Sequence, residues 1–179
     1  MAKQVINIGT TANDGTGDTL RNSMSKANSN FTELYGATGW QSRVDTTNTQ
    51  TIPATTITAI PITIGLESNG GLTLLDSNSK ITPIALGDFL VVNFAFTAVS
   101  PSGADHYCNI LFRVNGVTYR SVTEPYLKGT GVDDDMTLSI GLPVGTDFLT
   151  YGGQFFIYSD VSVVIKNRYI AVSRTHKAL

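Results

Sequence analysis

The last two thirds of the sequence alternate apolar and polar residues, and this period of two is the strongest constraint on the fold. In the segment 88–98, "DFLVVNFAFTA", Leu90, Val92 and Phe94 share one face of a strand, while Asn93 lies on the other. We therefore expect half-buried strands with one face toward a core.

A second segment, "HYCNILFRVNGVTYRSV", places Asn115 and Gly116 between two alternating runs, which predicts a β-hairpin with a type I′ turn. No long helical pattern separates the candidate strands, so we predict a mainly β fold, an antiparallel β-sandwich or jelly roll, preceded by an N-terminal arm with one short α-helix. The candidate strands are residues 60–66, 72–75, 88–98, 107–115, 117–123, 136–142, 154–158, 161–166 and 169–174.

The first 40 residues follow a different pattern. We predict a helix from Thr19 to Tyr35, because its apolar residues recur at spacings of four and three. These are Leu20, Met24, Ala27, Phe31 and Leu34. The rest of the helix is rich in Asn, Ser and Thr, which are mediocre helix formers, so the helix needs a surface to dock on.

A glycine-rich turn, "NDGTGD", precedes this helix. Gly15 and Gly17 are free to take positive φ, Asn13 or Asp14 can bond its own backbone, and Asp18 is placed as the helix N-cap. Before the turn, "AKQVINI" alternates like a lone strand that lacks a local partner. We divide the chain into an arm (1–40), a Thr-rich linker or edge strand (41–58) and a sandwich domain (59–179).

Composition excludes several classes of protein. Hydrophobic residues make up 41% and charged residues 15%, with a formal net charge of −2, which does not fit a nucleic-acid footprint. We see no signal sequence and no apolar run of membrane-spanning length, and expect synthesis without export. The single cysteine allows no intrachain disulfide.

The turn is not a phosphate-binding loop, because no Lys-Ser or Lys-Thr pair follows its glycines, and because Asp14 and Asp18 would repel an anion. It also lacks the ligand spacing of a calcium-binding EF-hand loop. We predict no cofactor or metal site here. The acids 133–135 are interpreted as a solvated loop tip, with a calcium ion as the alternative.

No residue pattern nominates an active site, and we predict that the protein is not an enzyme. Cys108 falls on the face that carries Ile110 and Phe112, which indicates a buried apolar role. His106 and His176 have no carboxylate in evident register.

Charge is segregated along the chain. One segment is acidic (Glu124, Asp133, Asp134, Asp135 and Asp147) and the last fifteen residues are basic (Lys166, Arg168, Arg174 and Lys177). Surface scatter and complementary contacts between subunits are both compatible with this pattern.

The turn and helix together resemble a short N-terminal segment shared by many structural proteins of tailed bacteriophages. The segment carries "NDGTGD", then "LR", "K.N.NF" and "ELY". The matching residues are Asn13, Asp14, Gly15, Thr16, Gly17, Asp18, Leu20, Arg21, Lys26, Asn28, Asn30, Phe31, Glu33, Leu34 and Tyr35. The resemblance covers roughly the first fifth of the chain and implies a virion component made in the host cytoplasm.

We therefore predict a homotrimeric capsid decoration or short head-fibre protein, bound to other virion proteins through its N-terminal segment. The alternatives are a tail-fibre or receptor-binding component and a carbohydrate-binding module, with a host glycan as a further partner. Residues assigned to attachment or to the oligomer helix are Asp18, Leu20, Arg21, Met24, Ala27, Asn30, Phe31, Leu34 and Tyr35. The tyrosines considered for sugar binding are Tyr119, Tyr126, Tyr151 and Tyr158.

Overall fold

The computed structural model describes residues 4–11, 14–36, 38–69, 71–100, 103, 106–124 and 127–175, and the side chains of all of these except 33–36, 122–124 and 175. The elements are α1 (Leu20–Gly36), β1 (Gly39–Asp45), β2 (Gln50–Ile52), β3 (Thr58–Ala59), β4 (Glu67–Asn69), β5 (Phe89–Val99), β6 (Cys108–Val114), β7 (Val117–Glu124), β8 (Asp133–Pro143), α2 (Thr146–Tyr151), β9 (Gly153–Ser159) and β10 (Val163–Thr175).

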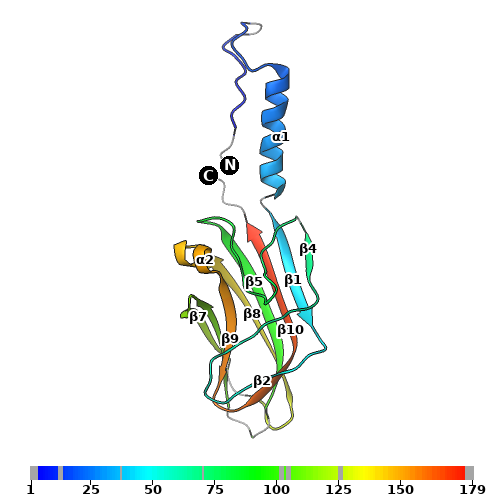
Figure 1. The fold of residues 1–179 in the computed structure, drawn as a ribbon, viewed down its shortest axis with the longest axis vertical. Coiled ribbons are helices and arrows are strands. Elements are labelled where there is room, and N and C mark those ends of the chain that lie inside the picture. Colours follow the sequence, from blue (N-terminus) through cyan, green and yellow to red (C-terminus); the bar gives the residue numbers. More distant parts are fainter. Residues whose placement is uncertain are drawn as a thin grey trace.

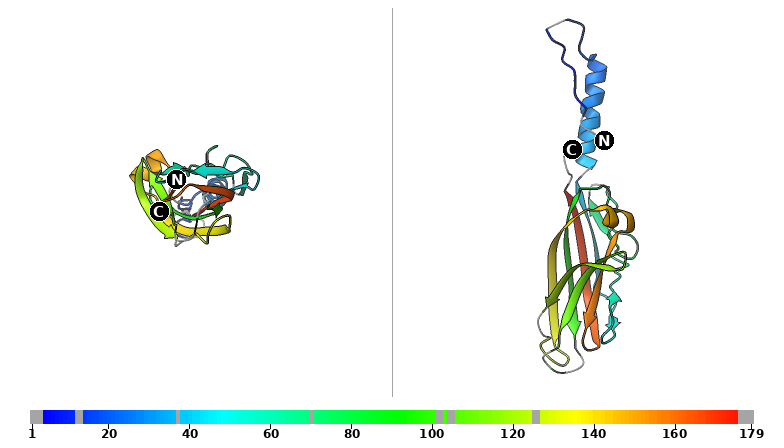
Figure 2. Two further views of the ribbon diagram at one scale, coloured as in Figure 1. Left: turned by 90° about the horizontal axis from the view of Figure 1, so that it is seen from below. Right: turned by 90° about the vertical axis from the view of Figure 1, so that its left-hand side faces the viewer.

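The strands form a two-layer antiparallel sandwich from which α1 projects at one end (Figures 1 and 2). One sheet has the order β4-β1-β10-β5-β8, with β2 also paired to β10, and the other has the order β3-β9-β6-β7. The predicted fold class, mainly β with an antiparallel sandwich and a short N-terminal helix, is confirmed.

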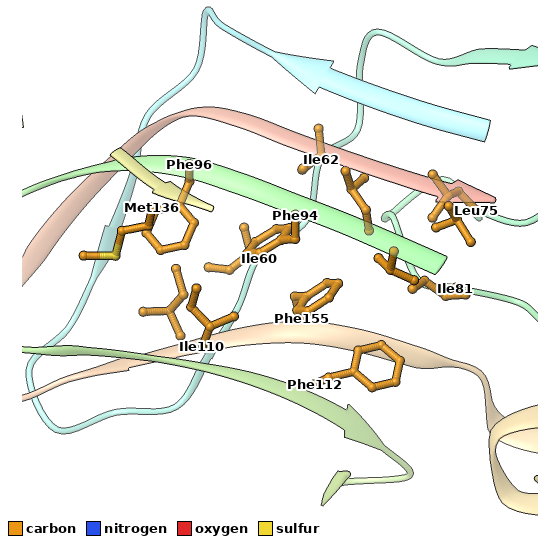
Figure 3. Packing of buried hydrophobic residues seen from close by; sticks show 14 of the residues in the cluster. Ile60, Ile62, Leu75, Ile81, Phe94, Phe96, Ile110, Phe112, Met136 and Phe155 are labelled. Carbon is orange, nitrogen blue, oxygen red and sulfur yellow. The ribbon is translucent and has the colours of Figure 1, made fainter. Parts of the chain in front are cut away.

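The core lies between the two sheets and consists of aliphatic side chains packed around a group of phenylalanines (Figure 3). Phe94 of one sheet stacks on Phe155 of the other with ring centroids 4.3 Å apart, and Phe112 lies 5.2 Å from Phe155. A Cβ atom on Gly153 would lie only 2.1 Å from the Phe112 ring, so only glycine fits there. Cys108 is fully buried among these residues, as its pattern predicted.

The strands with strong alternation were predicted well. Strands β5 to β9 match their predicted ranges closely, and the predicted hairpin turn is confirmed by positive φ at Asn115 (49°) and Gly116 (76°). The two predicted strands at 161–166 and 169–174 are one strand, β10, interrupted by a bulge where Asn167 has a φ of 50°.

Two short predictions were wrong. Residues 60–66 and 72–75 form no extended ladder, although Ile60, Ile62 and Leu74 are buried, because loops carry these side chains into the core. The short helix α2 and the three-residue strand β4 were not predicted.

The linker predicted at 41–58 is also wrong over its first half. Strand β1 pairs with both β10 and β4, and β2 adds an edge strand next to β10. The polar composition of β1 hid it. Its Gln41 side chain is buried because Oε1 accepts hydrogen bonds from the backbone N–H groups of Leu74 (2.8 Å) and Leu75 (2.6 Å).

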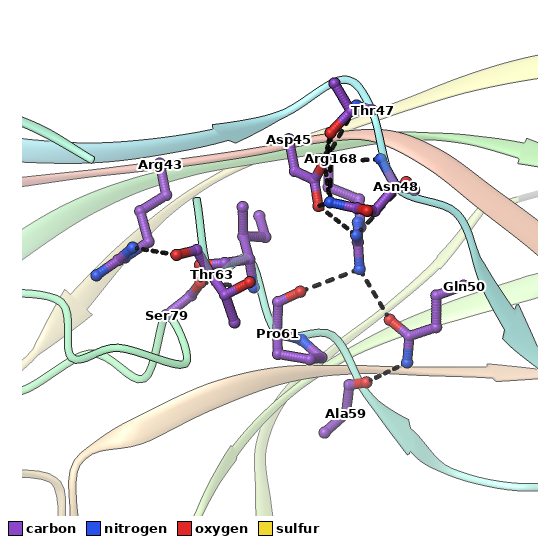
Figure 4. Close-up of polar contacts among 11 residues, drawn as sticks. Arg43, Asp45, Thr47, Asn48, Gln50, Ala59, Pro61, Thr63, Ser79 and Arg168 are labelled. Carbon is purple, nitrogen blue, oxygen red and sulfur yellow. Dashed lines mark hydrogen bonds and ion pairs between the residues drawn. The ribbon is translucent and has the colours of Figure 1, made fainter. Parts of the chain in front are cut away.

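A buried ion pair holds the turn between β1 and β2 to the bulge of β10 (Figure 4). Arg168 Nη2 lies 2.5 Å from Asp45 Oδ2, and the two side chains are 6% and 1% exposed. Arg168 Nη1 also donates to the Pro61 carbonyl (3.0 Å) and to Gln50 Oε1 (3.2 Å).

Asp45 has further donors in its own turn. Its Oδ1 accepts from the backbone N–H groups of Asn48 (2.9 Å) and Thr47 (3.1 Å). Burial alone would raise the pKa of Asp45, but these hydrogen bonds and the charge of Arg168 outweigh it, so the pKa lies below its ordinary value.

Several of the segregated charges form ion pairs within the chain, and Arg168 and Arg174 are buried, so they are not scattered over the surface; complementary contacts between subunits stay a prediction. The ion pairs are Lys166–Asp133 (2.8 Å), Lys128–Asp134 (3.1 Å), Arg168–Asp45 and Arg174–Asp88 (2.5 Å). Lys177 and the Glu124 side chain lie outside the described part of the chain. The acids 133–135 are not a loop tip, because they begin strand β8. Their carboxylates therefore point alternately to opposite faces of the sheet.

We expect Asp45→Ala to lower the free energy of unfolding by about 3–5 kcal/mol, because it leaves the Arg168 guanidinium buried without a counter-charge. Asp133→Ala is the matched control, since it removes an exposed pair and should cost less than about 1 kcal/mol. Urea unfolding at one protein concentration measures both. Equal losses in the two variants would contradict this account.

Candidate attachment site in the N-terminal arm

The described part of the arm, residues 4–36, consists of an extended segment followed by α1, and the extended segment runs alongside the helix (Figure 1). Helix side chains hold this segment in place. Asn30 Oδ1 accepts from Gln4 N–H (2.9 Å), while Asn30 Nδ2 donates to the Gln4 carbonyl (3.0 Å). Lys26 Nζ donates to the carbonyl of Val5 (3.1 Å). The prediction of a lone strand was therefore wrong, because the backbone groups that a second strand would satisfy are bound by Asn30 and Lys26.

Asp14 organises the glycine-rich turn. Its Oδ2 accepts from Thr10 N–H (2.7 Å), Thr10 Oγ1 (2.6 Å) and Thr11 N–H (2.8 Å), and its Oδ1 accepts from Thr16 N–H (2.9 Å). These bonds, led by the one from the Thr10 hydroxyl, hold the pKa of Asp14 far below its ordinary value. The predicted bonding of Asp14 to nearby backbone is confirmed, whereas Asn13 lies outside the described residues.

The two glycines of the turn serve different purposes. Gly15 has a φ of 70°, as predicted. Gly17 does not have positive φ, and it is needed because a Cβ there would lie 3.0 Å from both the Asn7 carbonyl oxygen and the Gly9 nitrogen.

Asp18 closes the turn onto the helix but does not cap it. Its Oδ2 accepts from Lys26 Nζ (2.6 Å) and from Asn7 N–H (2.8 Å), and these bonds lower the pKa of Asp18. The residue that caps α1 is Thr19, whose Oγ1 accepts from Asn22 N–H (3.3 Å). The N-cap prediction was wrong by one residue. The spacing of eight gave no signal for this pair, because residues eight apart on one helix lie about 12 Å from each other, and Asp18 reaches Lys26 from outside the helix.

The apolar stripe of α1 is largely exposed in the single chain. Leu20 is 79% exposed, and Met24 and Phe31 are each 55% exposed. Ala27 is half-buried and Arg21 is exposed. The side chains of Leu34 and Tyr35 lie outside the described part of the structure.

The extended segment adds to this surface, with Val5 74% and Ile8 90% exposed. The helix projects beyond the sandwich instead of packing along it (Figure 2). Exposed apolar side chains gathered on one projecting element are typical of an interaction surface.

A second cluster, missed in the sequence, joins His106 to Asp160. His106 Nδ1 lies 2.9 Å from Asp160 Oδ2, and Tyr107 N–H donates to Asp160 Oδ1 (3.0 Å). Burial would raise the pKa of Asp160, but these two hydrogen bonds outweigh it and lower the pKa. The neighbouring Cys108 is a poor nucleophile, because burial raises its pKa to about 11.

The described residues contain no group of three or more His, Cys, Asp or Glu side chains arranged to hold a metal ion. Nor does any helix in this part of the chain have the length and apolar character needed to cross a membrane. His176 and Tyr126 lie outside it.

Residues 3–88 match the model of a protein family described as "Bacteriophage T4 gp9/10-like protein, N-terminal". The match covers slightly less than half of the chain and extends past the arm to the residue before strand β5. This match supports a bacteriophage virion structural protein. The matched family is a structural type and not an enzyme type. No curated protein matches the sequence significantly.

Two solved structures align with most of this chain. The "Structure of Eiger TNF from S. frugiperda" aligns with a TM-score of 0.50 and 7% identity, over 79% of this chain and 94% of that chain. "PRD1 vertex protein P5" aligns with a TM-score of 0.48 and 15% identity, over 77% of this chain and 72% of that chain. At 7% identity, the similarity to Eiger TNF shows a common fold alone.

We expect Asp14→Asn to disorder the turn, because an amide NH₂ in place of Oδ2 would face the donors of Thr10 and Thr11. Amide hydrogen exchange at residues 10, 11 and 16 should accelerate, while Asp147→Asn, an exposed carboxylate of α2, should change nothing in the arm.

The same bonds should depend on pH in the wild-type chain. Because the pKa of Asp14 is lower in the folded arm than its unfolded value of about 3.9, the turn should be fully formed above about pH 4 and be lost as the pH falls through the lowered pKa. A turn that opens between pH 7 and 5 would contradict this assignment.

Proposed function

We propose that the protein is a homotrimeric virion structural protein, a capsid decoration or short head-fibre protein, attached to the particle through its N-terminal arm. The observation that carries the proposal is the exposed apolar stripe of α1 on an element that projects from the sandwich. A stripe of this spacing suits a small helical bundle, in which three copies would bury Leu20 and Met24 against one another.

A second surface supports assembly from copies of the same chain. Across strands β1, β10, β5 and β8, the outer face of the larger sheet carries three cross-strand rows without a charged residue, and Glu67 of β4 lies beside Ser42 at the edge of this face. The rows are Trp40–Ser173–Val91–Gly141, Ser42–Ala171–Asn93–Ser139 and Val44–Tyr169–Ala95–Thr137.

This uncharged face is continuous with the arm, because α1 ends at Gly36 and β1 begins at Gly39. Helices that associate about an axis therefore bring their β1 strands close together as well. Trp40 and Val91 are each 37% exposed in the single chain and would be covered in such an assembly.

This arrangement assigns attachment and display to different parts of the chain. We assign attachment and oligomer formation to the arm (1–40), and display to the sandwich domain (59–179), with residues 41–58 as part of the displayed sheets. The partners are other virion proteins and further copies of the chain.

In solution the wild-type protein should have three times the chain mass at micromolar concentration, and Met24→Asn should shift it toward the monomer, because a polar amide replaces an apolar contact. Ser25→Asn, the adjacent exposed position, introduces the same side chain off the stripe and should leave the mass unchanged. Sedimentation or light scattering measures this. A monomeric wild-type protein, or equal effects of both variants on the mass, would contradict the proposed trimer.

Location on the particle distinguishes the proposed capsid protein from the alternative, a tail-fibre or receptor-binding component. We expect gold-labelled antibodies to the sandwich to decorate capsids of intact particles. Particles assembled with Met24→Asn should carry less label than those with Ser25→Asn. Label confined to tails would favour the alternative, and absence from purified particles would remove the virion assignment for this chain.

A further inference from the structure

A cleft of about 220 Å³ opens on the outer side of the sheet β3-β9-β6-β7. We call it the basic cleft. Its polar and aromatic walls come from four places: Arg113 on β6, Gln154 and Phe156 on β9, Tyr151 at the end of α2, and Lys80 on the loop before β5. The hairpin turn between β6 and β7 and Gly152 complete the lining.

Arg113 is held firmly in this wall. Its guanidinium lies over the Phe156 ring, 5.2 Å from the centroid, and Nη2 donates to the carbonyl of Gly116. Stacking and one hydrogen bond fix the plane of the guanidinium and leave it other donors. Its Nε is buried and has no hydrogen-bond acceptor.

Lys80 is positioned by close backbone packing. Gly152 has a φ of 65°, and a Cβ there would lie 2.7 Å from the Ile81 carbonyl oxygen and 2.9 Å from Lys80 Cε. The glycine therefore lets the Lys80 stem lie directly against the end of α2, beside Tyr151.

The two cations of the cleft are not compensated. No acidic residue lines it, and within the described residues neither Lys80 nor Arg113 takes part in an ion pair. Elsewhere in this chain, Arg168, Arg174, Lys26, Lys128 and Lys166 all pair with a carboxylate. Arg21, Arg43 and Arg120 likewise have no ion pair among the described residues, but the basic cleft brings two unpaired cations together with no acid in its lining, and it therefore attracts an anionic group.

The remaining lining is suited to a sugar ring. Tyr151 is 45% exposed and offers an aromatic face for ring C–H groups, and the Gln154 side chain can bond hydroxyl groups. The volume is below the roughly 300–1,000 Å³ of pockets for drug-sized ligands, so it suits one ring and not an extended chain.

We propose that the basic cleft binds a carboxylate-bearing sugar, with Arg113 and Lys80 on the carboxylate and Tyr151 against the ring. This goes beyond the structural role proposed above and makes the displayed sandwich a binding domain for acidic surface polysaccharide. The cleft and the uncharged face lie on opposite outer faces of the sandwich, so an assembly that covers one leaves the other open.

The test uses the full-length chain and titrates it with galacturonic acid and, in parallel, with galactose, which has the same ring but lacks the carboxylate. Ligand-observed NMR or calorimetry should detect the acid and show at least about tenfold weaker binding of the neutral sugar. Arg113→Gln and Lys80→Gln should each weaken galacturonic acid binding by about tenfold, the scale of one hydrogen bond to a charged group.

Arg120→Gln is the matched control. It removes the same charge from the neighbouring strand β7, outside the cleft, and should change the affinity less than twofold. Circular dichroism of each variant confirms folding. Tyr151→Ala should weaken both sugars without changing their ratio.

Four results would overturn the proposal: equal binding of galactose, equal weakening by Arg120→Gln, inorganic phosphate binding as tightly as galacturonic acid, or no binding of the acid at millimolar concentration. None of them bears on the trimer or on the location in the particle, so this site and the structural role fail independently.

Discussion

The ion pair between Arg168 and Asp45 fixes the place where three strands meet. Strand β10 is the longest of the described strands and pairs with β1, β2 and β5. A bulge in its middle would leave backbone groups without partners and the sheet poorly aligned. Arg168 lies at that bulge and binds Asp45 at the end of β1, Gln50 at the start of β2, and the carbonyl of Pro61. The polar cluster therefore specifies the register on both sides of the bulge.

The arm is stabilised by a different kind of interaction from the sandwich. The sandwich buries phenylalanines between two sheets, whereas the arm is held by carboxylate, amide and ammonium groups that bind its own backbone. These polar bonds shape the arm without burying its apolar side chains. The apolar stripe of α1 therefore stays exposed and can pack against another protein surface. A hydrogen-bonded arm is thus already shaped for docking, which lowers the entropy lost on binding.

The sequence predicted what depends on periodicity. Alternation located β5 to β9, Asn115 and Gly116 located the hairpin, and the spacing from Leu20 to Leu34 located α1. The sequence did not predict elements in which buried polar side chains make the stabilising contacts. Strand β1 is built from Gln41, Arg43 and Asp45, whose burial depends on partners more than fifteen residues away, and no local pattern reveals such partners.

The arm shows the same limit at short range. The motif residues Asp14, Asp18, Lys26 and Asn30 were noticed through a resemblance, but their chemistry appeared only in three dimensions. Each binds the backbone of the arm, and Asp18 binds Asn7 and Lys26 instead of capping the helix. The specificity of the motif follows from these bonds, because a side chain of another length or with other hydrogen-bonding groups would not satisfy the same donors and acceptors. In the proposed assembly the motif would therefore determine the shape of the arm, and the apolar stripe would determine what the arm binds.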